Sequence, residues 1–182
     1  MEYSNHRIGD NKLIFTIRSL VNRLRTWYKF HVKYPWVEYQ GFVRVMHDVS
    51  FAKGMDIQIG NNVQFGPYCD IATNVHFGNN ILLASRVSIV GRKDHCFNDP
   101  TKTIWQGGRG DNGITIIEDD VWIGAGSIIM SGVIIGKGSI VAAGSVVTKD
   151  IPVCEIWGGN PSKKIRDRFD KEESKDMYLR LH

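Results

Sequence analysis

The sequence of 182 residues has few cysteines and no long apolar run. Its three cysteines, Cys69, Cys96 and Cys154, form an odd and sparse set, which excludes a disulfide-stapled scaffold and favours a reducing compartment. Because no run of about 18 apolar residues exists, no segment is expected to span a membrane. Met1–Asp10 is polar and lacks the apolar region of a signal peptide after it, so no secretion signal is expected.

The chain also has no concentrated patch of positive charge in a nucleic-acid-binding motif. The formal net charge is +4 and the isoelectric point is about 9.0, but the basic residues are spread along the chain. No stripe of Arg and Lys is interleaved with aromatic residues. We therefore expect no nucleic-acid partner, although the charge suits an anionic small-molecule ligand.

Bulky apolar residues recur every six residues in two blocks. They are Ile59, Phe65, Ile71, Phe77, Leu83 and Ile89, then Ile117, Ile123, Ile129, Ile135, Val141, Val147 and Val153. The following residue is mostly Gly or Ala, which we interpret as allowing a sharp backbone turn. A period of six fits neither a helix nor an alternating strand, and it predicts a parallel β-helix in which three hexapeptides form one triangular coil. The predicted fold class is therefore all-β, with the bulky residues inside the prism.

The extent of the six-residue spacing also indicates how the chain is divided into segments. Residues 1–40 are expected to form a helical appendage, residues 41–157 the β-helix, and residues 158–182 a basic tail with a helix over residues 162–180. The interval from Ile89 to Ile117 is 28 residues, which is not a multiple of six. Residues 92–113 are therefore expected to leave the solenoid as a loop, and their Gly, Asn, Asp and Pro content is typical of one.

Residues 10–30 have the three-and-four spacing of an amphipathic helix, with Asn11 near its N-cap. The apolar stripe is Leu13, Ile14, Ile17, Leu20, Val21, Leu24, Trp27 and Tyr28, and Arg18, Arg23 and Arg25 lie away from it. Two interpretations stay open. This helix packs against the prism or a neighbouring subunit, or, as a basic helix with Trp27 and Tyr28, it rests on a membrane surface.

Three runs in the second half resemble the hexapeptide-repeat acyltransferase family, in particular its sugar, maltose and antibiotic O-acetyltransferases. They are VWIGAGS at 121–127, AAGSVVTKDIP at 142–152 and GNPSKKI at 159–165. The resemblance covers residues 56–168. It implies a left-handed helix, acetyl-CoA as co-substrate without a metal, and a cytoplasmic homotrimer with sites between subunits. The inner face of the membrane is an alternative location.

His95 is the expected catalytic residue, because the family places a general base on such a loop. Imidazole suits this role since its pKa lies near neutral pH. Asp94 or Asp99 could orient the ring, and Asp94 is also a candidate substrate-binding residue. A Cys96 nucleophile beside His95 is disfavoured, because adjacent residues of an extended chain point to opposite sides.

The resemblance also implies the binding residues. Trp122 matches a tryptophan near the acceptor, although packing at a subunit interface would explain it equally. Trp105, in the loop, could stack on a sugar ring. The expected coenzyme A contacts are Ala125, Ala143 and Gly144 for the pantetheine arm, Thr148 and Lys149 near adenine, and Lys163 and Arg166 near the 3′-phosphate.

Three functions compete on this sequence. The first is transfer of an acetyl group to a carbohydrate hydroxyl by direct attack. The acceptor stays open among polysaccharide units, nucleotide-linked amino sugars, serine, small sugars and antibiotics, with a cell-surface glycan or its precursor favoured. The second is a zinc enzyme of the γ-carbonic anhydrase type, but His47, His76 and His95 lack the histidine spacing of that class. The third is a catalytically silent assembly module.

Overall fold

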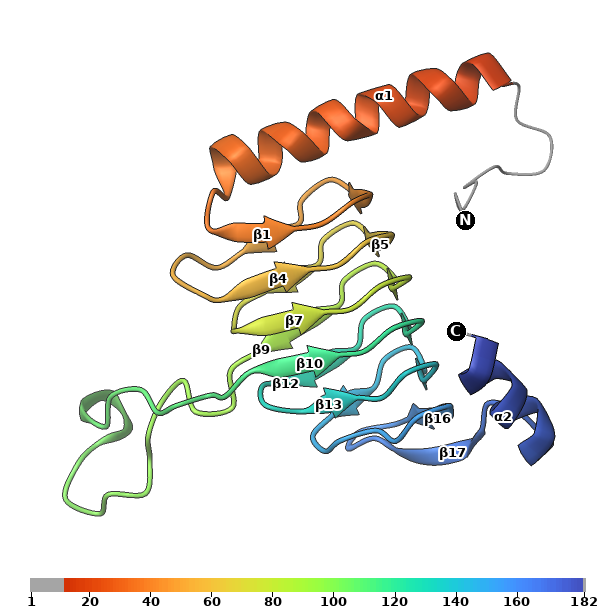
Figure 1. Cartoon of the computed structure of the whole chain (residues 1–182). Helices are drawn as coiled ribbons and strands as arrows, with labels where there is room; N and C mark the ends of the chain where they lie inside the picture. Colours follow the sequence, from red (N-terminus) through yellow and green to blue (C-terminus); the bar gives the residue numbers. More distant parts are fainter. Residues whose placement is uncertain (1–11, 182) are drawn as a thin grey trace.

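The computed structural model describes residues 12–181, and it is a three-sided prism of stacked parallel strands (Figure 1). Helix α1, Lys12–Tyr28, lies across one end of the prism, and helix α2, Glu172–Leu181, lies beside the other end. The expectations for Met1–Asp10, for Asn11 and for the side chains of Leu13 and Ile14 lie outside the described part.

The strands form three sheets, one on each side of the prism. Sheet A contains β1 Val37–Tyr39, β4 Ile57–Ile59, β7 Val75–Phe77, β10 Thr115–Ile117 and β13 Ile134–Ile135. Sheet B contains β2 Val43–Val45, β5 Val63–Phe65, β8 Leu82–Leu83, β11 Trp122–Ile123, β14 Ile140–Val141, β16 Glu155–Gly158 and β17 Lys163–Asp167. Sheet C contains β3 Ser50–Phe51, β6 Asp70–Ile71, β9 Ser88–Val90, β12 Ile128–Met130 and β15 Val146–Val147. Strands β1 to β15 visit A, B and C in turn, and β16 and β17 both join sheet B. The predicted all-β hexapeptide β-helix is confirmed, and the arrangement fits its left-handed form.

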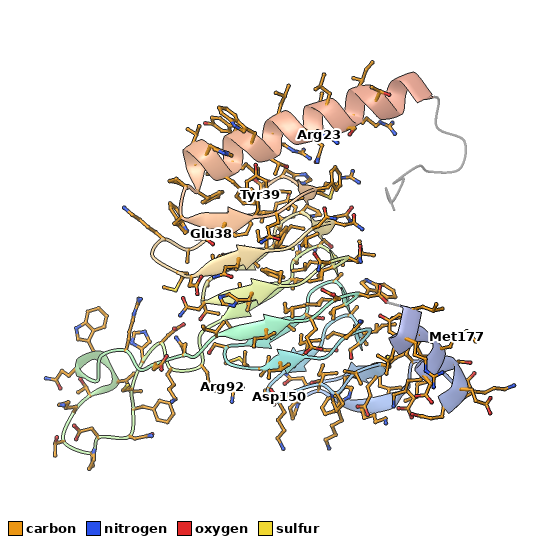
Figure 2. All side chains as sticks on the ribbon, viewed as in Figure 1. Arg23, Glu38, Tyr39, Arg92, Asp150 and Met177 are labelled. Carbon is orange, nitrogen blue, oxygen red and sulfur yellow. The ribbon has the colours of Figure 1, made fainter. Side chains whose placement is uncertain are left out.

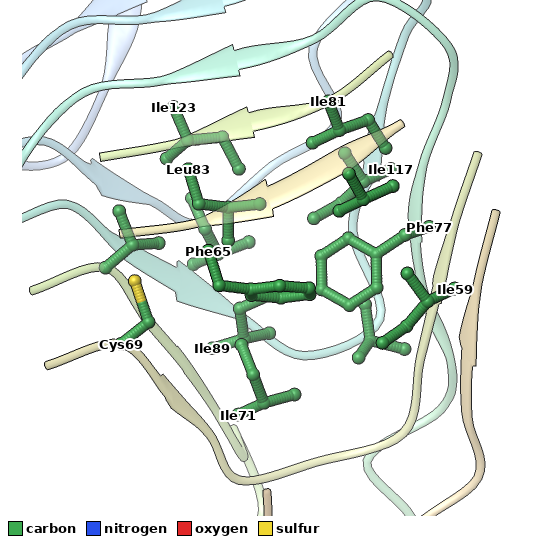
Figure 3. Close-up of a cluster of buried hydrophobic side chains, with 14 of the residues drawn as sticks. Ile59, Phe65, Cys69, Ile71, Phe77, Ile81, Leu83, Ile89, Ile117 and Ile123 are labelled. Carbon is green, nitrogen blue, oxygen red and sulfur yellow. The ribbon is translucent and has the colours of Figure 1, made fainter. Parts of the chain in front are cut away.

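The predicted inward positions form the core, with one exception. Twelve of the thirteen repeat residues are buried, and Figure 3 shows several of them meeting across the three sheets. The prediction for Val153 is wrong, because that side chain is 38% exposed. Ile151 instead bridges to Ile135 and is buried. Pro152 has no N–H with which to continue the ladder, and the phase of the repeat shifts there.

The reason for a small residue after each bulky one differs from the expected one. Gly60 and Gly124 do not have left-handed backbone angles. A Cβ on Gly60 would overlap the carbonyl oxygen of Gly78, and a Cβ on Gly124 would overlap the backbone of Ala143 in the next coil. The left-handed residues come two positions later, for example Asn62 with φ of 60°. The small residues therefore permit close stacking of coils rather than the turn itself.

Helix α1 packs on the prism with its polar side. Asn22 and Thr26 are buried, and their side chains donate hydrogen bonds of 3.2 and 2.8 Å to the carbonyl oxygen of Val43. A π-helical turn, Lys29–Lys33, follows, and its Phe30 enters the core. The expected packing of this helix against the prism is therefore confirmed, but its polar side makes the contact and its apolar stripe faces away. Among the described residues, no helix combines the length and apolarity needed to cross a bilayer.

Both ends of the solenoid differ from the expected boundaries. Strand β1 pairs in parallel with β4 and so lies before the boundary expected at residue 41. The helix expected over residues 162–180 is wrong in its first part. Strand β17 turns back and pairs antiparallel with β16, and α2 begins only at Glu172. Gly159, with φ of 97°, lies in the turn between the two strands, and such an angle strongly favours glycine.

Candidate functional site

The chain leaves the solenoid between β9 and β10, at the edge between sheets C and A (Figure 1). The two limbs of this loop are tied together by two backbone hydrogen bonds of 2.9 Å, from Cys96 to Gly108 and from Gly110 to Lys93. A short 3₁₀ turn, Ile104–Gln106, closes the far end. The loop is therefore a defined hairpin-like projection.

The base of the loop is anchored to two later coils. The backbone N–H of Arg92 donates to the Ser131 hydroxyl at 2.8 Å, and its guanidinium donates to the carbonyl oxygen of Thr148 at 2.7 Å. The amide oxygen of Asn112 accepts from the Lys93 N–H at 2.6 Å. These contacts fix the first loop residues next to the corner that carries Thr148.

His95 follows this anchored base directly and is exposed. Its imidazole has no hydrogen bond or ion pair within residues 12–181. The Asp94 carboxylate accepts a 3.0 Å bond from the Asn112 amide, and Asp99 accepts from Thr101 and pairs with Lys102. The bonds from Thr101 and Lys102 hold the pKa of the Asp99 carboxyl below its usual range. Neither Asp94 nor Asp99 therefore orients the His95 ring in this chain.

The far part of the loop presents large apolar side chains to solvent. Phe97 is 70% exposed, Ile104 is 60% exposed and Trp105 is 91% exposed. Three large apolar side chains exposed on one loop are typical of a segment that contacts a ligand or another protein. Trp105 is thus available for stacking, but no described residue of the same chain forms a pocket around it.

The corner between sheets B and C is lined by small residues. We call the run of Ala125, Gly126, Ala143 and Gly144 the small-residue corner. All four are exposed, and the Gly144 N–H donates to the carbonyl oxygen of Ala125 at 2.8 Å. Gly126 and Gly144 both have φ of 70°, and the space beside them is open. A flexible chain could lie along this corner without meeting a side chain.

The structure separates the two cations expected together. Lys163 follows Ser162, whose N–H donates to Val146 at 2.8 Å, so Lys163 lies by the end of the small-residue corner. Arg166 lies farther along β17 and donates to the carbonyl oxygen of Asp167 at 2.9 Å. The intervening Lys164 pairs with Glu155 and Asp167, and these bonds raise its pKa.

Trp122 lies on sheet B, away from the loop of its own chain. Its register partners Leu82 and Ile140 continue an apolar stripe, in which Leu82 and Trp122 are 51% and 52% exposed. One chain therefore distributes the candidate residues over three places. The loop base with Thr148 and Lys149 lies at one edge, the small-residue corner lies at another, and Trp122 lies on a face.

The outer faces of the prism change character along its axis. In the second and third coils the outward residues of the sheets are mainly polar, such as Gln58, Gln64 and Asp70. In the later coils Ile116, Ile128 and Ile134 point outward, and each is 38–40% exposed. This apolar surface is typical of subunit contacts in an oligomer.

A polar cluster joins helix α2 to the solenoid, and sequence reasoning missed it. A groove of about 820 Å³ lies there. In it Asp120 accepts bonds of 2.7 Å from both Arg168 and Tyr178. Asp120 has a left-handed backbone with φ of 56°, an angle that Asp tolerates better than most residues. An Asp in a repeat turn, here after Glu118 and Asp119, gave no signal of these long-range partners.

This cluster predicts a loss of helix docking at high pH. Burial and the bond to Asp120 raise the pKa of the Tyr178 phenol above its ordinary value of 10.0. A raised pKa in the folded state contributes stability that is present below about pH 10 and is lost as pH rises further. Limited proteolysis of α2 should accelerate above pH 10 in the wild type. Tyr178→Phe should weaken docking at neutral pH and flatten that dependence, and an unchanged profile would contradict this role.

The described histidines do not gather into a metal site. His76 bonds to Asp56 at 2.9 Å, which holds the pKa of that carboxyl below its usual range, and His47 packs edge-on against Tyr68. Within residues 12–181, no group of three or more His, Cys, Asp or Glu is arranged to hold a metal ion.

Known proteins resemble this chain both in the repeat and in the fold. The model of the bacterial transferase hexapeptide (six repeats) matches residues 114–149, which span β10 to β15. This segment of the chain therefore carries the bacterial hexapeptide repeat. The maltose O-acetyltransferase of Clostridium difficile 630 superposes with a TM-score of 0.63 and 26% identity, over 88% of this chain and 90% of that one. The family resemblance of the sequence is thus confirmed in repeat and fold.

Relatives in sequence and a second structure are also acyltransferases. A chloramphenicol acetyltransferase of Klebsiella aerogenes is 49% identical over 61 residues, 34% of this chain but only 29% of that protein. A probable macrolide acetyltransferase of Lysinibacillus sphaericus is 39% identical over 122 residues, 63% of this chain and 65% of that one. AntD, an N-acyltransferase from Bacillus cereus solved with a nucleotide-linked amino sugar and coenzyme A, has a TM-score of 0.55 and 25% identity, over 85% and 97% of the chains.

One relative belongs to a different enzyme class. The mitochondrial gamma carbonic anhydrase 2 of Arabidopsis thaliana is 31% identical over 195 aligned positions, which cover 97% of this chain and 64% of that protein. The chain is therefore similar in sequence both to acetyltransferases and to a carbonic anhydrase.

Proposed function

We propose that the chain is a CoA-dependent O-acetyltransferase that moves an acetyl group from acetyl-CoA to a carbohydrate hydroxyl. The proposed acceptor is a cell-surface polysaccharide or its precursor. The acyltransferase relatives support the reaction class, and the exposed Trp105 ring supports a sugar acceptor. The three free cysteines suit the reducing cytoplasm, where we place the protein.

The observation that carries this proposal is the anchored, unpaired His95. Among the described residues its ring has no hydrogen-bond partner, and the neighbouring Asp94 accepts from Asn112, so a ring nitrogen is available to accept a proton from an acceptor hydroxyl. In the proposed reaction His95 takes the proton of the acceptor hydroxyl while that oxygen attacks the thioester carbonyl. The C–S bond then breaks, the acetyl ester is formed, and the proton on His95 passes to the departing sulfur, so that coenzyme A leaves as the free thiol. The hydrogen bonds of Arg92 to Ser131 and Thr148 hold the start of the loop, three residues before His95, against the later coils of the prism.

The residues suited to acetyl-CoA fit its shape and charge. The open small-residue corner suits the narrow pantetheine arm, because Gly126 and Gly144 leave free space beside the backbone. Lys163, at the end of that corner, suits a phosphate group. Arg166 is a weaker candidate for the same phosphate, since its guanidinium already donates to backbone carbonyl groups.

We further propose a homotrimer with each site shared between two subunits. In one chain the loop, the small-residue corner and Trp122 lie apart. In the proposed trimer, sheet B of a neighbouring subunit, with its Trp122, lies against the loop. The exposed Phe97, Ile104 and Trp105 of the loop and the apolar stripe around Trp122 support such a contact. A ring of heterologous contacts closes with three-fold symmetry.

The direct test is turnover of acetyl-CoA against a panel of sugars, glycan precursors, serine and antibiotics. Thiol release should accompany an acetylated product seen by mass spectrometry with at least one carbohydrate. No acetylated product with any acceptor, from folded protein that binds no coenzyme A, would refute the proposal. Product only with an antibiotic would keep the reaction and refute the carbohydrate acceptor.

The carbonic anhydrase relative keeps a zinc enzyme as a second candidate. It aligns with nearly the whole chain, but His76 is held by Asp56 and the described histidines do not converge. Elemental analysis and a CO₂ hydration assay separate the two candidates. Stoichiometric zinc with hydration activity would favour the second.

Lys163→Ala should raise the KM for acetyl-CoA about tenfold and leave kcat nearly unchanged, because lost uniform binding shows in KM. The KM for the 3′-dephospho analogue should change little. Lys164→Ala is the matched control, since Lys164 is paired with Glu155 and Asp167. Equal effects of Lys163→Ala on both donors would show that this cation does not contact the 3′-phosphate.

A further inference from the structure

Helix α1 has its apolar side turned away from the protein. The period of 3.6 residues puts the buried Asn22, Thr26 and Phe30 on one side. The opposite side carries six apolar residues that are each 53–61% exposed, namely Ile17, Leu20, Val21, Leu24, Trp27 and Tyr28. We call these six residues the α1 stripe. An ordinary surface helix buries such a stripe, so this one fits a partner outside the chain.

The charge around the α1 stripe has one sign. Residues 11–37 contain six Lys and Arg and no Asp or Glu. By the helical period, Arg18 and Arg25 lie on one flank of the stripe and Arg23 lies on the other. Lys29, at the end of the helix, donates to the carbonyl oxygen of Met46 and thereby links this basic segment to the prism.

The placement of the helix leaves the whole α1 stripe accessible to a flat surface. Helix α1 runs across the end of the prism, and side chains project from it on the side away from the strands (Figures 1 and 2). Trp27 and Tyr28, each 55% exposed, lie at its C-terminal end, where the Trp27 ring stacks on that of His31. Such amphipathic rings prefer the interface between hydrocarbon and water.

We propose that α1 docks the protein on an anionic lipid bilayer, with the α1 stripe in the acyl–headgroup boundary and its flanking arginines on lipid phosphates. Length, apolar outer side, basic flanks and aromatic residues are those of an interfacial helix. Pairing of α1 with α1 of a second copy would bring two all-basic segments together, which like-charge repulsion opposes. This proposal does not depend on acetyl transfer.

The test is co-sedimentation of the full chain with vesicles in low salt. One set of vesicles is pure phosphatidylcholine, and the other contains about 30% phosphatidylglycerol. The wild type should bind the anionic vesicles at least tenfold more tightly, and salt should weaken binding. Leu20→Glu/Leu24→Glu and Arg23→Glu/Arg25→Glu should each reduce binding at least tenfold. Met177→Glu, an equally exposed apolar position on α2, and Lys171→Glu/Arg180→Glu are the matched controls.

Circular dichroism and light scattering complete the design. Wild-type protein that binds neither vesicle would overturn the proposal without any variant. Binding that is unchanged by both α1 variants, or reduced equally by the α2 controls, would overturn it as well. Folded α1 variants that change the oligomeric state would show that a second copy covers the stripe, which also contradicts a lipid surface.

Discussion

Replacing His95 with alanine is expected to lower kcat by about 10²–10⁴-fold without loss of folding, which is the range for a lost general base. The side chain is exposed and makes no bond within the described residues, so stability should change by less than about 0.5 kcal/mol. The pH profile of wild-type kcat/KM should fall on its acidic limb, as expected for a reaction that needs a general base. The variant should lose that limb of the profile.

His47→Ala is the matched control, because His47 is also an exposed histidine but lies in the first coil. It should retain wild-type turnover. A His95→Ala protein within about threefold of wild type would show that another group takes the proton. An equal loss of activity in both variants would show that the loss is not specific to His95 and would contradict its role as general base.

Replacing Phe65 with alanine is expected to reduce the free energy of unfolding by about 3–5 kcal/mol. Phe65 is fully buried, and its ring lies 5.4 Å from that of Phe51 and 5.2 Å from that of Phe77 (Figure 3). These rings come from three different sheets, so the cavity would open where all three sides of the prism meet. Urea denaturation at fixed protein concentration measures the loss.

Phe65→Leu should cost less than half as much, since the cavity is smaller. Trp105→Ala, which truncates a large but 91% exposed ring, should leave stability within about 0.5 kcal/mol. A loss below about 1 kcal/mol for Phe65→Ala would mean that neighbouring coils collapse into the space.

The spacing of six predicted the core because each residue at that spacing must fill the same place in a repeated coil. It failed at Val153, where Pro152 interrupts the ladder and Ile151 takes the inward position. It also could not predict strand β17. Whether a basic segment forms a strand or a helix was decided by the turn at Gly159 and by pairing with β16, which are tertiary features.

The helix at the N-terminus shows a different limit of sequence reasoning. Its amphipathic pattern was correct, but the pattern does not say which side faces the protein. The decision rests on Asn22 and Thr26, which both reach the carbonyl oxygen of Val43 and draw the polar side inward. No rule of apolar periodicity contains that contact.

For the candidate site, the sequence led to the predictions for His95 and for the small residues of the corner, but it did not predict how these parts lie relative to one another. It did not distinguish Lys163 from Arg166, because the bonds of Arg166 to backbone carbonyl groups depend on the β17 strand. It also missed the bonds of Asp120 to Arg168 and Tyr178, which join residues 48 and 58 positions apart.

Subunit complementation tests the central claim, a catalytic site made from the loop of one chain and the wall of its neighbour. His95→Ala and Trp122→Ala proteins, each inactive alone, are mixed in equal amounts and allowed to exchange subunits. Random assembly of a cyclic trimer restores both residues in about a quarter of the clefts. The account therefore predicts recovery of about one quarter of wild-type turnover. No recovery after exchange has been verified, or a monomer by light scattering, would contradict it.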